Sequence, residues 1–185
     1  MVASYSLIAT TLGTLAVIAA ALGLVTGAVL LFQGGRMRIR RTFRHQERHP
    51  IAWAWCIAAV ATAGSLYFSE IVGFVPCSLC WYQRIAMYPL VLILGMGALR
   101  GEAVVWRYAL PLSGVGLAIA MYHVIIQWQP AADVGACTTG VPCTGRYVAV
   151  FGFVSIPSMS LAAFILIAAL LGLVRTLEVG TTEAS

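Results

Sequence analysis

The chain has 185 residues, of which 61% are hydrophobic and only 9% are charged, so it is too apolar to be a water-soluble domain. Its formal net charge of +5 comes from eleven basic residues, all of them arginine. Most of these arginines lie in short segments between apolar stretches, a pattern typical of membrane proteins rather than of nucleic-acid-binding surfaces. We therefore predict an all-α integral membrane protein with no nucleic-acid partner.

Five apolar stretches are each long enough to cross about 30 Å of hydrocarbon, which takes roughly 20 helical residues. We expect these stretches at about residues 7–32, 51–68, 81–99, 110–128 and 156–174. The linkers are short and no internal repeat is visible, so adjacent antiparallel helices should pack as one bundle. The predicted fold is a four-helix transmembrane bundle plus one additional N-terminal transmembrane helix.

The first stretch is interpreted as a permanent helix and not as a cleaved signal peptide. No basic segment precedes it, and it is longer than the usual apolar core of a signal. We divide the chain into residues 1–49, an extra helix with an arginine-rich cytoplasmic loop, residues 50–176, a four-helix bundle, and residues 177–185, a cytoplasmic tail. Every chemically interesting position falls in the second segment.

The arginine-rich loop predicts the orientation of the helices, because cytoplasmic loops of membrane proteins carry an excess of Lys and Arg. With this loop in the cytoplasm, the N-terminus and the loops after the second and fourth stretches are extracytoplasmic, and the C-terminus is cytoplasmic. We therefore expect a multi-pass protein of the cell membrane, plasma or inner. The arginines of the loop are Arg36, Arg38, Arg40, Arg41, Arg44 and Arg48.

Four of the five cysteines fall in the two outer loops. Cys77 and Cys80 form a Cys-x-x-Cys pair at the start of a helix, where unpaired N–H groups and the helix dipole favour a thiolate. Cys137 and Cys143 lie in the other outer loop, where disulfides are chemically allowed. Four cysteines permit three pairings, and the residues alone leave these open. Cys56 lies within an apolar helix and is assigned no role.

Three polar residues stand within the apolar helices near the cysteine end. Arg84 follows Cys80 by four residues and shares its helix face, so its cation should stabilise a Cys80 thiolate. The alternative is that Arg84 snorkels to the membrane surface. His123 and Gln127 are also four residues apart, and together with Arg84 they could line one polar pocket. His123 is alternatively a hydrogen-bonded packing residue.

The outer loop of residues 129–155 is rich in Pro, Gly and Thr, which is typical of a mobile arm. A disulfide between Cys137 and Cys143 would close about seven residues and contribute roughly 2.4 kcal/mol. That contribution is modest for a bundle held by lipid. Redox exchange is therefore the preferred reason for this pair, with a structural disulfide as the alternative.

Two separate motifs resemble one known family. Residues 71–90, which contain the run Pro76-Cys-Ser-Leu-Cys-Trp-Tyr-Gln-Arg84, resemble the first redox motif of the DsbB/BdbC disulfide-bond formation proteins, particularly the BdbC branch. Residues 140–147, followed by Phe-Gly-Phe at 151–153 and Ile-Pro at 156–157, are similar to the second motif of that branch. The resemblance covers about residues 50–176.

This resemblance implies a membrane thiol-disulfide oxidoreductase, a protein-disulfide:quinone oxidoreductase. Such a protein reoxidises an extracytoplasmic thioredoxin-fold donor of the DsbA/BdbD type and passes the electrons to a membrane quinone, either ubiquinone or menaquinone. No metal is expected. The resemblance implies four catalytic cysteines, Cys77 and Cys80 near the quinone and Cys137 and Cys143 facing the donor, and three quinone-binding residues, Arg84, His123 and Gln127.

The chain departs from the family pattern in its added first helix, in Gln83 where some relatives carry Glu, and in the close spacing of its second cysteine pair. Three alternatives remain open at this stage. One is a quinone reductase of the vitamin K epoxide reductase type. The second is a four-thiolate zinc site that joins the two outer loops. The third is a small transporter or structural membrane protein with ordinary disulfides.

Overall fold

The computed structural model describes residues 2–32, 34, 35, 37, 48–135, 137 and 141–182. These residues form five long helices that are all apolar enough to span a membrane, and within the described ranges there is no β-strand beyond a single bridge between Val150 and Val154. The predicted all-α membrane fold is confirmed. The helices are α1 (Val2–Leu31), α3 (Arg48–Leu66), α4 (Ser78–Arg100), α5 (Trp106–Trp128) and α6 (Ile156–Thr182).

Short helical segments extend or connect the long helices. The π-helix η1 (Tyr67–Ile71) continues α3, and two 3₁₀ segments, η2 (Ala103–Val105) and η3 (Pro130–Ala132), flank α5. Helix α4 begins directly after Cys77, whose extended backbone (φ −75°, ψ 172°) makes it the N-cap residue. It ends at Gly101, whose left-handed backbone (φ 68°) suits a residue without a Cβ. The first cysteine pair therefore occupies the first turn of α4.

Helix α6 lies at the centre of the bundle and packs against α1, α3 and α5, while α4 packs against α3 and α5. Its side chain Phe164 is fully buried, together with Leu90 and Leu94 of α4. Helix α5 approaches α6 closely at Gly116, where a methyl group would overlap the ring of Phe164. Small residues that permit such close approach are typical of helix packing in membranes.

The N-terminal helix α1 is packed onto the bundle along α6. Small residues recur on one face at spacings of three and four, at positions 9, 13, 16, 20 and 23. A Cβ atom on Gly23 would lie 3.0 Å from the backbone N and Cα atoms of Leu166, so the two helix backbones nearly touch there. Nearer the N-terminus, Ala9 is buried in a cluster with Phe68 and Val148, and a Cβ atom on Gly13 would lie 3.0 Å from the side chain of Val150. Glycine at position 23 is therefore required by the packing.

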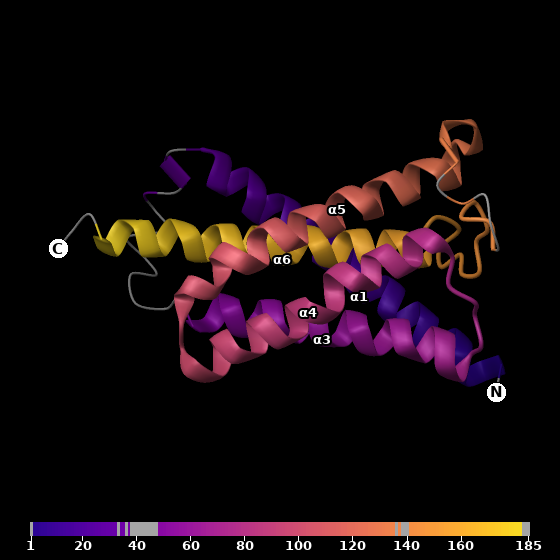
Figure 1. Ribbon diagram of the computed structural model, residues 1–185, viewed down its shortest axis with the longest axis horizontal. Helices are drawn as coiled ribbons and strands as arrows, with labels where there is room; N and C mark the ends of the chain where they lie inside the picture. Colours follow the sequence, from indigo (N-terminus) through magenta and orange to yellow (C-terminus); the bar gives the residue numbers. More distant parts are fainter. Residues whose placement is uncertain are drawn as a thin grey trace.

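Both cysteine-bearing connections lie at one end of the bundle. Figure 1 shows the N-terminus, the α3–α4 connection and the α5–α6 loop at this end, and the α4–α5 turn and the C-terminus at the other. The relative placement of these segments agrees with the predicted alternation of the helices. The predicted loop arginines Arg36, Arg38, Arg40, Arg41 and Arg44 lie outside the described residues.

Helix α6 continues to Thr182, so the first residues of the segment expected as a cytoplasmic tail, residues 177–185, are helical. The indole N–H of Trp106 donates a hydrogen bond to the Glu178 carboxylate, and the Arg175 guanidinium lies 5.5 Å from the centre of the Trp106 ring. These contacts pin the last turns of α6 against the start of α5. Polar contacts at the helix end therefore extend α6 beyond its apolar stretch.

Candidate active site: a dithiol and a disulfide at one end of the bundle

The first cysteine pair is a dithiol in the first turn of α4. The Sγ atoms of Cys77 and Cys80 lie 3.0 Å apart, within hydrogen-bond distance, and neither is bonded covalently. A disulfide has an S–S length of about 2.05 Å, so only a small movement separates this dithiol from its oxidised form. Cys77 is buried, with 5% of its surface exposed, and Cys80 is half-buried.

His123 of α5 connects this dithiol to the second outer loop. The amide Nε2 of Gln83 lies 3.0 Å from His123 Nδ1, and because an amide nitrogen can only donate, Nδ1 is the acceptor. The proton of the neutral ring is then on Nε2, which lies 3.1 Å from the carbonyl oxygen of Cys143 and 3.7 Å from the Sγ atom of Cys77. The Nε2–H group of His123 therefore points toward the sulfur of Cys77 in the first outer loop and toward the backbone oxygen of Cys143 in the second.

The surroundings of Cys77 favour its thiolate. The hydrogen bond with Cys80 is the largest cause that lowers the pKa of Cys77, to about 4, while burial opposes this shift and His123 adds to it. At neutral pH Cys77 is therefore a thiolate whenever the pair is reduced. A sulfur with a low pKa is also a good leaving group, and a stabilised reduced form makes the corresponding disulfide more oxidising.

The second cysteine pair forms a disulfide between Cys137 and Cys143, whose Cα atoms are 5.8 Å apart. Cys143 is 2% exposed and belongs to the same buried cluster as Cys77, Leu79 and Ile126. Cys137 is only half-buried. The structure thus brings the two pairs together through Cys143 and Cys77, and leaves Cys137 on the outer side.

The outer loops differ from two readings of the sequence. Cys137 and Cys143 are bonded to each other, so they do not present the free thiolates that the alternative of a four-thiolate zinc site requires; Cys77, Cys80 and His123 have ligand atoms within 4.8 Å of one another. The second loop is also no free arm in its described part. Val148 and Val154 are buried against the bundle, as is Cys143.

Gln127 holds the second loop against α5. Its amide Nε2 donates to the carbonyl oxygen of Gly145 at 3.2 Å, and its Oε1 accepts from the Ser155 hydroxyl at 2.6 Å. The guanidinium of Arg146 donates to the backbone oxygen of Gln127 at 3.2 Å and lies 4.1 Å from the centre of the Trp128 ring. The part of the loop that follows the buried Cys143 is therefore fixed to the end of α5, by contacts that the sequence alone did not indicate.

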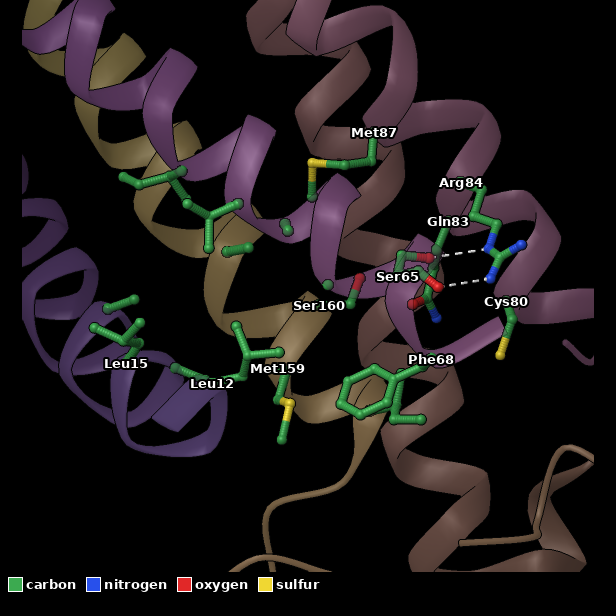
Figure 2. Close-up of a pocket in the computed structure, with 18 of the residues that line it drawn as sticks. Leu12, Leu15, Ser65, Phe68, Cys80, Gln83, Arg84, Met87, Met159 and Ser160 are labelled. Atoms are coloured by element: carbon green, nitrogen blue, oxygen red, sulfur yellow. Dashed lines mark hydrogen bonds between the residues drawn. The ribbon is translucent and has the colours of Figure 1, made fainter. Parts of the chain in front are cut away.

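Arg84 finds its partner on α3. Its Nε and Nη2 atoms donate to the hydroxyl and the backbone oxygen of Ser65 at 3.0 and 3.1 Å, and its guanidinium lies 5.2 Å from the centre of the Trp81 ring (Figure 2). This arrangement replaces the alternative of free snorkelling. Ser65 was not singled out in the sequence, because nothing in a single helix pattern shows which residue of the neighbouring helix faces an arginine.

A cavity of about 460 Å³ lies between α1, α3, α4 and α6. Its polar end contains Cys80, Gln83 and Arg84, and the rest of its wall is almost wholly aliphatic or aromatic (Figure 2). Tyr88 lines the same cavity, and its buried hydroxyl has no hydrogen-bond partner within the described ranges. An apolar cavity with one polar end beside a reactive sulfur fits a ring with polar carbonyls and an apolar tail.

The single polar pocket expected for Arg84, His123 and Gln127 is divided in two. Arg84 lies at the large cavity, whereas His123 and Gln127 lie at a smaller one that also touches Cys77 and the second loop. Cys80 borders both. The division arises because α5 presents its polar side chains to the outer loop, while Arg84 turns toward α3.

Membrane-spanning helices that carry a buried dithiol against a loop disulfide define a class of protein, the membrane thiol–disulfide exchange proteins. Comparisons with known proteins identify the member of this class. The family described as disulfide bond formation protein DsbB matches residues 47–174. The chain belongs to the DsbB family and is a multi-pass membrane disulfide oxidoreductase.

Named relatives agree with this family. Disulfide bond formation protein C of Bacillus subtilis (strain 168) is 50% identical over 115 residues, which cover 62% of this chain and 83% of that protein. Probable disulfide formation protein C 2 of Bacillus anthracis is 48% identical over 125 residues, 68% of this chain and 89% of that protein. No solved structure matches the chain. The family match favours disulfide formation over a vitamin K epoxide reductase or a transporter.

Proposed function

We propose that this protein reoxidises an extracytoplasmic thioredoxin-fold thiol donor and passes the electrons through its two cysteine pairs to a membrane quinone. One observation carries the proposal: Cys143 of the loop disulfide and Cys77 of the dithiol are buried in one cluster and share the Nε2 atom of His123. The names of the relatives, disulfide formation proteins, support the direction of the reaction.

Burial suggests where the donor enters. Cys137 is the more exposed sulfur of its disulfide, so the donor thiolate attacks Cys137, forms a mixed disulfide with it and releases the Cys143 thiolate. The second thiol of the donor then displaces Cys137. The donor leaves as a disulfide, and Cys137 and Cys143 are left reduced.

The loop cysteines next reduce the first pair. The Cys143 thiolate attacks Cys77 of a Cys77–Cys80 disulfide and releases the Cys80 thiolate, and Cys137 then displaces Cys77 to restore the loop disulfide. The pKa of Cys77, lowered to about 4 mainly by the hydrogen bond with Cys80, makes Cys77 a good leaving group in this last step. His123 holds the backbone of Cys143 beside Cys77 during the exchange.

Cys80 is the cysteine that passes the electrons to an acceptor in the large cavity. Its half-buried sulfur borders the cavity, and the Arg84 cation one helical turn away favours negative charge at this end. A quinone bound there would supply the electron acceptor for the two electrons and two protons that are released when Cys77 and Cys80 form their disulfide again. Arg84 and Ser65 would hold the polar end of that molecule, and the aliphatic walls exclude water from the reacting sulfur.

The cysteine-bearing end of the bundle faces the outside of the cell membrane in this proposal. At the opposite end, Arg100 is the last residue of α4, Arg107 lies in the first turn of α5, and Arg175 lies in the last turns of α6. An excess of arginine marks the cytoplasmic side. The donor therefore meets Cys137 in the extracytoplasmic space, where disulfides persist.

Oxidation of a reduced thioredoxin-fold donor by the purified full-length chain in nanodiscs tests the proposal. With menaquinone or ubiquinone in the lipid, the unaltered chain should oxidise many equivalents of donor, and Cys80→Ser should stop after the loop disulfide is consumed. Cys137→Ser should oxidise none. Turnover by Cys80→Ser equal to that of the unaltered chain, or no donor oxidation with any quinone, would contradict the proposal.

A further inference from the structure

The large cavity is elongated, and its two ends differ. Its polar end lies at Cys80, Arg84 and Ser65, and from there it follows α3 inward as far as Trp53. Twelve residues separate Ser65 from Trp53, which corresponds to about 18 Å along a helix. The cavity is therefore extended along α3, with the reactive sulfur near its outer end and mostly hydrocarbon side chains along the rest of its length.

Helix α1 supplies one whole side of this cavity. Leu12, Leu15, Ala19 and Leu22 recur at spacings of three and four and all line it (Figure 2 shows Leu12 and Leu15 across from Cys80). This face is next to Gly23, which packs on α6, and Leu12 reaches across to Gly64 of α3. Without α1 the same surface of α3 and α6 would be an open groove in contact with lipid.

The family match begins at residue 47, so α1 lies outside the segment that this chain shares with the DsbB family. The helix is nevertheless tightly seated, because Gly23 allows its backbone to touch that of Leu166. The helix therefore has one face toward α6 and another toward an apolar cavity, and it forms part of the wall of that cavity.

We infer that α1 and α3 together form a binding slot for the isoprenoid tail of the quinone whose ring is held at Cys80 and Arg84, an inference that rests on the proposed function. The slot starts at the polar end where the ring would sit, and its walls are apolar and continuous from there. Lipid tails are as apolar as leucine, so the slot gains little from removing the tail from lipid. Its contribution is orientation, which keeps the ring beside the Cys80 sulfur.

Photolabelling of the unaltered full-length chain in phosphatidylcholine nanodiscs tests this slot directly. The probe is a long-chain menaquinone analogue with a diazirine on a distal isoprene unit. We expect its adducts on the α1 peptide that contains residues 12–22, in competition with unlabelled long-chain menaquinone. Competition distinguishes the quinone tail from a phospholipid chain, because an excess of phospholipid is already present.

Two matched variants on α1 test the same slot by binding. Ala19→Phe places a ring into the cavity, whereas Ala21→Phe makes the same change at an exposed position on the opposite face of the helix. For long-chain menaquinone, Ala19→Phe should raise the equilibrium Kd about three- to tenfold, because the new ring and the tail cannot both occupy the slot while the quinone ring stays at Cys80, and Ala21→Phe should leave the Kd unchanged. A menaquinone ring without a tail should bind all three chains equally.

The outcomes separate this inference from the proposed function. Adducts that avoid α1, or a long-chain Kd that Ala19→Phe and Ala21→Phe alter equally, would overturn the slot while quinone-dependent donor oxidation persists. Labelling that unlabelled menaquinone does not compete would likewise overturn it, in favour of a lipid chain. Absence of both labelling and quinone-dependent donor oxidation would remove the proposed function and the slot together. The labelling experiment uses the unaltered chain, so it still tests the slot if Ala19→Phe fails to fold.

Discussion

The reduction potential of the Cys77–Cys80 pair should depend on pH half as steeply as that of an ordinary dithiol. In the reduced pair one proton lies between two sulfur atoms that are 3.0 Å apart, and the pKa of Cys77 is lowered to about 4, with the hydrogen bond from Cys80 as the main cause. Reduction above this pKa therefore takes up one proton for two electrons. For a two-electron couple each proton contributes about 30 mV per pH unit, against about 59 mV for two ordinary thiols.

The sign of the effect follows from the lowered pKa. A thiolate that is favoured in the folded protein stabilises the reduced form at pH values above about 4, and this stabilisation is lost as the pH falls through that value. The Cys77–Cys80 disulfide is thus a stronger oxidant at pH 7 than a pair with ordinary pKa values. Below about pH 4 its potential should again change with two protons.

Equilibration with glutathione buffers between pH 5 and pH 8, followed by alkylation and mass spectrometry of the Cys77–Cys80 peptide, measures the slope. Because the pair is read as a ratio of oxidised to reduced peptide, slow access of reagent to buried Cys77 does not alter the result. His123→Phe removes a smaller cause of the lowered pKa, so it should move the break in slope to higher pH. A slope near 59 mV per unit across this range would refute the reasoning.

Three further substitutions follow from the contacts. Arg84→Ala should raise the KM for quinone about tenfold or more, because it removes a charged hydrogen-bonding group. Arg84→Lys should restore only part of the lost affinity for quinone. Equal KM values for Arg84→Ala and the unaltered chain would contradict the assigned place of Arg84. Gln127→Ala removes the hydrogen bonds to Gly145 and Ser155 that hold the loop. In stopped-flow assays it should slow reduction of the Cys77–Cys80 disulfide by the loop cysteines without changing the KM for quinone. A changed KM with an unchanged rate of this reduction would contradict the assigned place of Gln127. Gly23→Leu should lower the free energy of unfolding in detergent by about 1–3 kcal/mol, measured by thermal or denaturant unfolding. Gly27→Leu should leave this free energy unchanged, because there is open space around Gly27. Equal decreases for the two variants would argue against the tight contact between α1 and α6 at Gly23.

Much of the fold was predictable because hydrophobic length alone specifies a membrane helix. The apolar stretch expected at 110–128 became α5, which ends at Trp128, and the stretch expected to begin at 156 became α6, which begins at Ile156. The first cysteine pair was also predictable, since a polar turn followed by an apolar run marks a helix start. Cys77 is indeed the N-cap of α4.

The site could not be completed from the sequence because its contacts depend on how the helices are rotated against one another. The spacing of Arg84 from Cys80 indicated a shared helix face, but the facing residue, Ser65, belongs to another helix. The same holds for the hydrogen bond between Gln83 and His123. A helical pattern shows which residues share a face, and only the packing shows what that face meets.

The role of α1 was also beyond the sequence pattern. Its small residues at positions 13, 16, 20 and 23, spaced by three and four, indicate a packing face. The same spacing is compatible with a dimer of this helix or with any neighbouring helix. The structure places Gly23 on α6 and Gly13 on Val150 of the outer loop, and the adjacent face, with Leu15 and Leu22, then borders the cavity. What the second face of α1 contacts is therefore known only once the packing of the first face is known.

The central claim is that electrons pass between the pairs through Cys143 and Cys77, and disulfide trapping tests it most directly. Full-length chains that retain only one cysteine of each pair are oxidised in nanodiscs, and the linked peptides are quantified by mass spectrometry. The variant Cys80→Ala, Cys137→Ala should form a Cys77–Cys143 disulfide rapidly and almost completely, because both residues are buried in one cluster and both lie beside the Nε2 atom of His123. The variant Cys77→Ala, Cys137→Ala should form a Cys80–Cys143 disulfide much more slowly, and equal or reversed yields would contradict the proposed relay.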